Sequence, residues 1–272
     1  MKRILISVVL AAICLSSFGQ KQEEKKKFQI KGQPIVTVFA NYHAGIGNAN
    51  KESGFALDRA YLGYQFSLTE KLSGKVVFDM GSTKVSGSDL ERVAYIKNAM
   101  LSWKTGNFTL DFGLIGLEQF NVQEKFWGYR YIMKSFQDEY KFGSSADMGI
   151  LGKYKFTKWL SADITISNGE GYKKLNGDNK YRYAVGATIL PVKNLTIRTY
   201  YDLASKNIEG DETKDQQNLA FFAGYKHELF SIGAEYNQMY NTKFKEDNDQ
   251  SGFSVYSTIK LEDQFNLFGR YD

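Results

Sequence analysis

Basic and acidic side chains are interleaved with aromatic ones in a single stretch of the sequence, residues 116–145. Opposed charges of this kind can select the solutes that cross a narrow passage, because the charges lining a constriction set its electrostatic field. Arg130 is the strongest single candidate, since it lies mid-segment between aromatic residues that would fix its direction. The alternative for each residue is that its charge pairs with a neighbour or lies in solvent. The candidates are Lys125, Arg130, Lys134 and Lys141 on the basic side, and Glu118, Glu124, Asp138 and Glu139 on the acidic side.

Residues suited to catalysis are scarce. The chain has two histidines: His43 is expected at a strand end and His227 in a short turn, and neither has an evident partner for nucleophilic catalysis. The sequence contains no G-x-S-x-G motif, no P-loop and no His/Cys spacing typical of a metal site. The acidic runs 209–212 and 246–249 could bind a divalent ion or bridge to lipopolysaccharide through one, although solvated loop charge is the simpler interpretation. The sequence therefore predicts no enzyme, no cofactor and no metal centre.

The elements that would position these charges are predicted from the order of the connections. From about residue 35 onward, apolar and polar residues alternate in about thirteen segments of roughly 8–12 residues, joined by short and long polar connections in turn. Tight turns at one rim and longer loops at the other are typical of a transmembrane β-barrel, so we predict an all-β, antiparallel, porin-like barrel. The short connections are 69–73, 104–107, 157–159, 191–194, 227–229 and 261–264, and the long ones are 44–54, 82–92, 116–145, 168–181, 203–217 and 239–250.

The polar face of these segments predicts a water-filled interior. Lipid requires apolar side chains on the outer face of a barrel, whereas a lumen accepts Arg, Lys, Asp, Thr and Gly. A soluble β-sandwich also alternates apolar and polar residues and is the alternative, but its connections need not alternate in length. The charged candidates for the pore wall are Arg59, Lys75, Asp79, Lys97, Asp111, Asp147, Lys153, Asp163, Arg182 and Arg198.

The amino terminus predicts export. Residues 1–19 combine a basic start, an apolar core and small residues before a cut near Gly19, as in a cleaved signal peptide; an anchor helix, or a lipoprotein acylated at Cys14, are the alternatives. Residues 20–33 are expected to form a flexible periplasmic leader, and Pro34 to open a barrel domain over 34–272. Loss of residues 1–19 lowers the formal net charge of +5 by two, and so modest an excess predicts no nucleic-acid partner.

Three stretches carry a family resemblance: 123–130 (QEKFWGYR), 134–147 (KSFQDEYKFGSSAD) and 268–272 (FGRYD). They resemble Bacteroidetes outer-membrane porins akin to the phosphate-selective porin O/P group. The resemblance implies passive diffusion of small hydrophilic solutes, including anionic, phosphate-like ones, with the 116–145 loop as the pore constriction and often a homotrimeric assembly. Phosphate selectivity in that group rests on a stack of lumenal arginines and lysines, whereas this sequence shows no dense basic ladder.

An outer-membrane location, with outer-membrane lipid and lipopolysaccharide as partners, follows from the export signal and the barrel together. Single-chain bacterial barrels have even strand numbers, whereas about thirteen strands are visible in this sequence. We therefore expect a chain truncated at its carboxyl terminus, and a barrel of 16 strands when complete; the alternative is that the strand count is wrong by one. The alternative function is a non-conducting barrel with an adhesive or structural role, its lumen plugged by the long segment. A soluble, β-rich secreted protein is the third interpretation.

Overall fold

The computed structural model describes residues 29–44, 53–82, 92–175, 180–205, 214–262 and 265–272. The predicted signal peptide, with Cys14 and the cut near Gly19, lies outside the described residues, as does most of the predicted leader. The acidic run 209–212 and parts of five connections also lie outside them.

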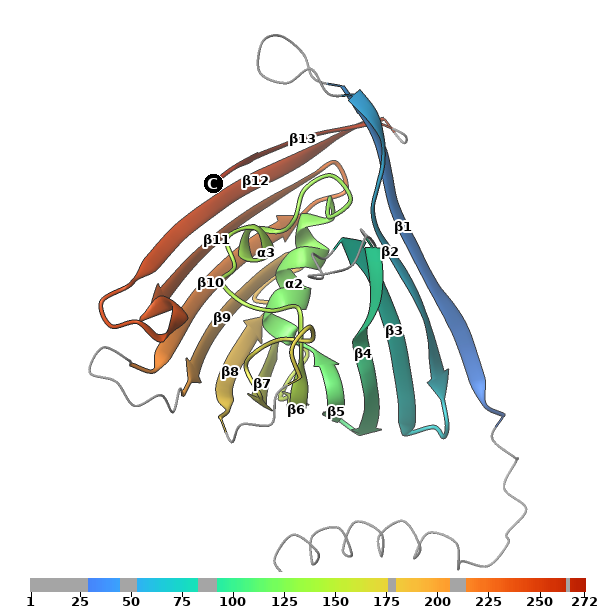
Figure 1. The fold of residues 1–272 in the computed structure, drawn as a ribbon. Helices are drawn as coiled ribbons and strands as arrows, with labels where there is room; N and C mark the ends of the chain where they lie inside the picture. Colours follow the sequence, from blue (N-terminus) through green and yellow to red (C-terminus); the bar gives the residue numbers. More distant parts are fainter. Residues whose placement is uncertain (1–28, 45–52, 83–91, 176–179, 206–213, 263–264) are drawn as a thin grey trace, which may run out of the picture.

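One antiparallel sheet contains thirteen strands, each hydrogen-bonded to its neighbours in sequence order (Figure 1). This confirms the prediction of an all-β antiparallel fold with about thirteen visible strands. The strands are β1 (Lys31–Ala44), β2 (Ser53–Ser67), β3 (Leu72–Ser82), β4 (Arg92–Thr105), β5 (Phe108–Gly116), β6 (Ala146–Lys155), β7 (Leu160–Ser167), β8 (Arg182–Ile189), β9 (Leu195–Ala204), β10 (Gln216–Lys226), β11 (Phe230–Tyr240), β12 (Gln250–Glu262) and β13 (Phe265–Tyr271). Within the described residues the sheet is open, since β1 pairs with β2 alone and β13 with β12 alone.

The distribution of buried residues is the reverse of that in a soluble protein. On β7, Ile164 is 63% exposed, whereas its neighbours Asp163 and Thr165 are 6% and 5% exposed. The same holds on β6, where Ile150 is 43% exposed and Asp147 is 1% exposed. Large apolar side chains on one face and buried polar ones on the other are what a strand needs when its outer face meets lipid. Because the described strands form one sheet, they do not make the two facing layers of a β-sandwich.

Strand β1 begins three residues before Pro34, where the barrel domain was predicted to start. Lys31 pairs with Ser67 and Pro34 pairs with Tyr64, because β2 extends far enough to offer both partners. Proline is tolerated here because β1 is an edge strand of the described sheet, so its missing N–H removes no hydrogen bond to a second neighbouring strand.

Strand β4 contains a bulge, which explains why its alternation is irregular in the sequence. Ile96 and Asn98 both have partners on β3, whereas Lys97 between them has none in the register. Ile96 is 41% exposed on the outer face, while Asn98 is 5% exposed on the opposite one. An extra residue in one strand re-aims the side chains around it, and here it directs both Lys97 and Asn98 toward the inner face.

The segment after β5 folds back onto the concave, polar face of the sheet, where Figure 1 shows it in green. It contains two helices, α2 (Glu118–Trp127) and the short α3 (Phe136–Glu139). Glu118 in the first turn of α2 and Lys125 in its last turn complement the helix dipole. Gly128 ends the helix in the left-handed conformation (φ 77°), and its N–H donates to the carbonyl of Glu124. A one-turn 3-10 helix, η2 (Thr242–Phe244), lies in the connection between β11 and β12.

Candidate functional site

Helix α2 is fastened to the sheet through a buried arginine. Arg198 on β9 donates to both carboxylate oxygens of Asp163 on β7, at 2.7 Å and 3.0 Å, and through Nε to Gln119 of α2 at 2.9 Å. Its side chain is 0% exposed. Gly186 on β8 makes this possible, because a Cβ there would collide with the guanidinium. Arg198 and Asp163 were both predicted for the wall: they lie on the inner face, but α2 covers them.

Aromatic side chains anchor the rest of the segment to β10, β12 and β13. Trp127 packs against Tyr256 at a centroid distance of 5.2 Å, and Phe126 against Phe222 at 5.1 Å. Tyr129 stacks on Phe268 of β13 at 4.1 Å. Edge-to-face and stacked pairs of this kind add about 0.5–1.5 kcal/mol each beyond the burial of area. A segment with so many docked rings is held in one position.

Side-chain amides complete this attachment, two of the three contacts being buried, and sequence reasoning missed them. The contacts are Gln137 Nε2 to Asn237 Oδ1 at 2.9 Å, Asn218 Nδ2 to the carbonyl of Phe142 at 2.8 Å, and Gln250 Nε2 to the carbonyl of Tyr140 at 2.8 Å. Asn218 and Asn237 were visible as polar residues on inner faces. Nothing in the sequence indicates which polar group of the loop each would meet, because the partners lie 76 to 110 residues apart.

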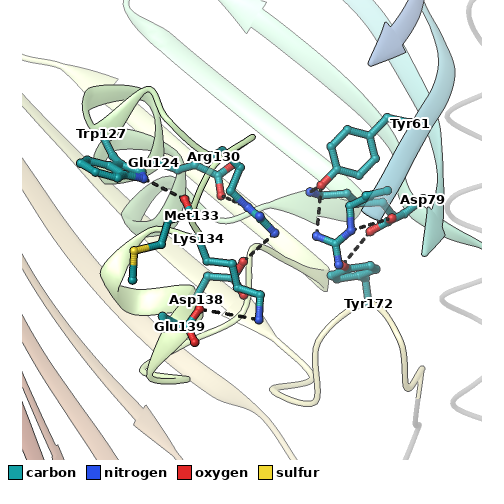
Figure 2. A network of polar contacts seen from close by, with 12 residues as sticks. Tyr61, Asp79, Glu124, Trp127, Arg130, Met133, Lys134, Asp138, Glu139 and Tyr172 are labelled. Atoms are coloured by element: carbon teal, nitrogen blue, oxygen red, sulfur yellow. Dashed lines mark hydrogen bonds and ion pairs between the residues drawn. The ribbon is translucent and has the colours of Figure 1, made fainter. Parts of the chain in front are cut away.

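The predicted loop charges pair largely with one another (Figure 2). Arg130 contacts Glu124 of α2 at 3.4 Å through Nε, and Asp138 of α3 at 2.9 Å through Nη2. Lys134 lies 3.9 Å from Glu139. Arg130 therefore joins the two helices of the segment, and its side chain keeps 18% of its surface exposed. Burial raises the pKa of Glu124, and the charges of Lys97 and Arg130 offset part of this effect.

A second group of charges lies on the wall opposite Arg130, where Figure 2 shows it. Arg59 contacts the buried carboxylate of Asp79 at 3.2 Å. The Asp79 carboxylate also accepts a hydrogen bond from the hydroxyl of Tyr172 at 3.0 Å. Lys97 donates to the hydroxyl of Tyr61 at 3.1 Å and lies 4.4 Å from the centre of its ring. The bulge in β4 thus joins Lys97 to a wall network that the sequence did not predict.

The remaining wall candidates divide between two roles. Lys153 bridges the wall to α2, since it lies 3.3 Å from Asp111 and 3.5 Å from Glu118. Arg182 pairs with Asp202, and Asp147 accepts the backbone N–H of Gly169 at 2.6 Å and of Met148 at 2.8 Å. Asp147 and Asp202 are almost fully buried, so these three contacts chiefly hold the structure together. Together with Arg182 they also line a separate cavity of about 270 Å³ beside the 116–145 segment.

Open space remains between the docked segment and strands β1 to β6. A rim cavity of about 430 Å³ lies by the short turn between β2 and β3. A middle cavity of about 340 Å³ shares Lys75 and Met100 with it. A loop cavity of about 410 Å³ shares Lys97, Glu124 and Ser145 with the middle one. The three cavities therefore follow one another along the inner face, from the short-turn rim to the loop segment.

Basic residues outnumber acidic ones around the loop cavity. Lys75 lines both the rim cavity and the middle cavity, and Lys125 is exposed in the last turn of α2. The charged residues that line the loop cavity are Arg59, Lys97, Arg130, Lys134, Lys141 and Lys173 on the basic side, and Glu124, Asp138 and Glu170 on the acidic side. The middle cavity is balanced, with three residues of each sign: Lys75, Lys97, Lys153, Asp111, Glu118 and Glu124.

Both histidines are engaged in local contacts. His43 Nδ1 lies 3.4 Å from Asn41 Oδ1, and His227 Nδ1 accepts the backbone N–H of Leu229 at 3.2 Å. The described residues contain no group of three or more His, Cys, Asp or Glu side chains able to hold a metal ion. Within the acidic run 246–249, Glu246 pairs with Lys214 and Asp249 accepts the N–H of Asn241. No helix among the described residues is long and apolar enough to cross a membrane.

Comparisons with known proteins match this chain by fold and not by sequence. No protein-family model matches it, and neither does any curated protein. OmpTdeltaL8, a loop L8 deletion mutant of the Vibrio cholerae outer membrane protein OmpT, superposes with a TM-score of 0.53 at 14% identity, over 89% of this chain and 80% of that one. Salmonella typhi OmpF, in a complex with daunomycin, gives a TM-score of 0.46 at 13% identity, over 89% of both chains.

The first of these likenesses defines the class of fold. An antiparallel sheet with an apolar outer face and a buried polar inner face is the architecture of an outer-membrane β-barrel protein, and OmpTdeltaL8 shares it. This chain therefore has an outer-membrane β-barrel fold.

Proposed function

We propose that this protein is an outer-membrane porin that lets small hydrophilic solutes diffuse passively, with residues 116–145 as its pore constriction. The row of three cavities beside the docked segment carries this proposal. A segment attached on one side by Arg198, Trp127 and Asn218, and facing open polar space on the other, narrows a lumen without filling it. Charges at such a narrowing decide which solutes cross it.

We further propose a preference for anionic, phosphate-like solutes. The excess of basic residues around the loop cavity supports it, as does the resemblance of 123–130 and 134–147 to the phosphate-selective porin O/P group. In this proposal Lys125, Arg130 and Lys134, with Glu124, Asp138 and Glu139, form the charged constriction. Arg59, Lys75, Lys97 and Lys153 form the wall that solutes meet. Asp79, Asp111, Asp147 and Arg198 support that wall from buried positions, and Arg182 from a mostly buried one.

The same proposal includes export by a signal peptide cleaved near Gly19, insertion among outer-membrane lipid and lipopolysaccharide, and assembly as a homotrimer. The export part rests on residues 1–19, and the trimer on the family resemblance. Mass spectrometry of the mature amino terminus tests the cut. Chemical cross-linking in detergent tests the trimer, which would be contradicted by a monomer at every cross-linker concentration.

Conductance in a planar lipid bilayer tests the proposed function directly. We expect the purified protein, in the form that migrates faster on gels before boiling, to give discrete current steps in potassium chloride. Because folded barrels resist detergent until they are heated, the gel shift separates a failure to fold from a failure to conduct. A folded protein with no current steps would instead support a non-conducting barrel with an adhesive or structural role.

A further inference from the structure

A second segment also enters the concave side of the sheet. Residues 168–175 follow β7, and their backbone turns inward at two glycines with positive φ, Gly169 at 99° and Gly171 at 79°. The N–H of Gly169 donates to Asp147 at 2.6 Å, and the N–H of Tyr172 donates to the carbonyl of Ala146 at 3.0 Å. In the sequence, residues 168–181 are recognisable only as one of the long connections, so this inward course is a finding of the structure.

Tyr172 crosses from this segment to the opposite wall. Its hydroxyl donates to Asp79 of β3 at 3.0 Å, although its own segment follows β7. The ring lies 5.8 Å from that of Tyr95 and 5.9 Å from the ammonium of Lys97, both on β4 (Figure 2 shows Tyr172 beside Asp79). A hydrogen bond between a loop and a wall four strands away closes off part of the space between them.

Two further contacts fix this crossing in place. Arg59 holds Asp79 by an ion pair at 3.2 Å, so the acceptor for the Tyr172 hydroxyl is itself oriented. Gly171 approaches the 116–145 segment so closely that a Cβ on it would lie 2.5 Å from Ser144 Oγ. The two inward segments therefore interlock, and both contribute residues to the loop cavity, which Glu170, Gly171, Tyr172 and Lys173 line on one side.

We propose that Tyr172 forms a second constriction of the pore, a bar across the loop cavity between β7 and β3 that limits solute size. This inference rests on the proposed porin function and assigns a specificity-determining residue outside the 116–145 segment. The bar is the phenol ring of Tyr172, whose hydroxyl is bonded to Asp79. Lys97 and Lys173 flank it. The space that remains beside the ring therefore favours small, hydrated anions over bulky neutral solutes.

Substitution of Tyr172 in bilayer recordings tests this proposal. We expect Tyr172→Ala to raise single-channel conductance roughly 1.5-fold or more and to admit larger sugars in liposome swelling, because pore radius limits both. Tyr172→Phe keeps the ring but loses its hydrogen bond to Asp79, so we expect conductance near that of the native protein with larger open-channel fluctuations. Tyr236→Phe is the matched control, since its hydroxyl bonds Gln238 at 3.0 Å on the exposed face.

Thiol labelling gives a second test, which does not require the protein to fold with alanine at position 172. The chain has one cysteine, Cys14, within the predicted signal peptide, so Tyr172→Cys offers a single thiol in the mature protein. We expect a methanethiosulfonate reagent to lower the current of open Tyr172→Cys channels, and to leave Tyr236→Cys channels unchanged. Native channels that conduct, combined with complete labelling at Tyr172→Cys and no change in current, would overturn the second constriction alone. A native protein without current would overturn the porin function instead.

Discussion

Arg198 and Asp163 form a two-bonded ion pair between β9 and β7, with N to O distances of 2.7 Å and 3.0 Å, beneath helix α2. Both groups are nearly inaccessible to water. The pair also orients Arg198 Nε toward Gln119, and so connects the wall to the segment that narrows the lumen.

Removing one partner of this pair should be costly. We expect Arg198→Ala to lower the free energy of unfolding by roughly 3–5 kcal/mol, because it leaves Asp163 buried without its counter-charge. The measurement is the temperature or denaturant concentration at which the fast-migrating gel form disappears. The double variant Arg198→Met with Asp163→Leu is the control, and it should lose less than the single variant because no charge is stranded. Equal losses in both variants would contradict this account.

Charge reversal in the 116–145 segment should shift ion selectivity. Arg130→Glu places a third carboxylate beside Glu124 and Asp138, so we expect the anion-to-cation permeability ratio to fall on the order of threefold. Lys125→Glu and Lys134→Glu should act in the same direction with smaller effect, because both side chains are more exposed to screening water.

Reversal potentials across a potassium chloride gradient measure this ratio. Lys158→Glu is the matched control, since Lys158 lies in the exposed turn between β6 and β7, at the rim far from α2. Reversal potentials that move equally for Arg130→Glu and Lys158→Glu would remove Arg130 from the constriction.

Selectivity should also depend on pH through Glu124. Burial raises the pKa of this carboxyl, so it takes up a proton at a pH where an exposed glutamate stays ionised. Lowering the pH through the raised pKa therefore removes one negative charge and should strengthen the preference for anions. Glu124→Gln should show the stronger preference already at neutral pH and should lack this step.

The same raised pKa makes a prediction for stability. A carboxyl whose pKa is higher in the folded state than in the unfolded one costs stability while it is ionised. That cost is fully present above the folded-state pKa, declines as the pH falls below it, and is gone below the unfolded-state pKa. We expect Glu124→Gln to stabilise the protein at neutral pH, and the difference from the native protein to vanish in mild acid. A native protein that loses stability relative to Glu124→Gln as the pH falls would contradict this sign.

A charge on the apolar face separates a membrane protein from a soluble one. Ile164 is 63% exposed, so its replacement by lysine would be harmless in water. Against lipid, Ile164→Lys should cost about 2–4 kcal/mol if the residue lies near the bilayer midplane. Folding yield into lipid vesicles and denaturant unfolding measure the effect, and Lys158→Glu is again the control. A neutral Ile164→Lys variant would argue for a soluble, β-rich protein.

The strand number and the two faces of the sheet were predictable from sequence, because side chains on a strand alternate between its two faces. This alternation can be recognised within a few consecutive residues. The inward position of Arg198 or Asp163 follows from that alternation alone. The bulge at Lys97 does not, since it depends on how β4 is registered against β3. The charges of the 116–145 segment were likewise recognisable, but their pairing through Arg130 required the positions of both α2 and α3.

The sequence by itself determined an all-β sheet with a polar face, a charged aromatic segment and few residues for catalysis. Only the tertiary structure decided which of the inward charges are covered and which face open space. Arg198 points to the inner face because of strand alternation, and Lys97 does so because of the bulge in β4. Helix α2 nevertheless buries Arg198 and leaves Lys97 beside the cavities. The exposure of a side chain depends on contacts between residues far apart in the chain, such as Gln119 with Arg198 and Tyr172 with Asp79. Such contacts cannot be predicted from local periodicity, because periodicity describes only neighbouring residues.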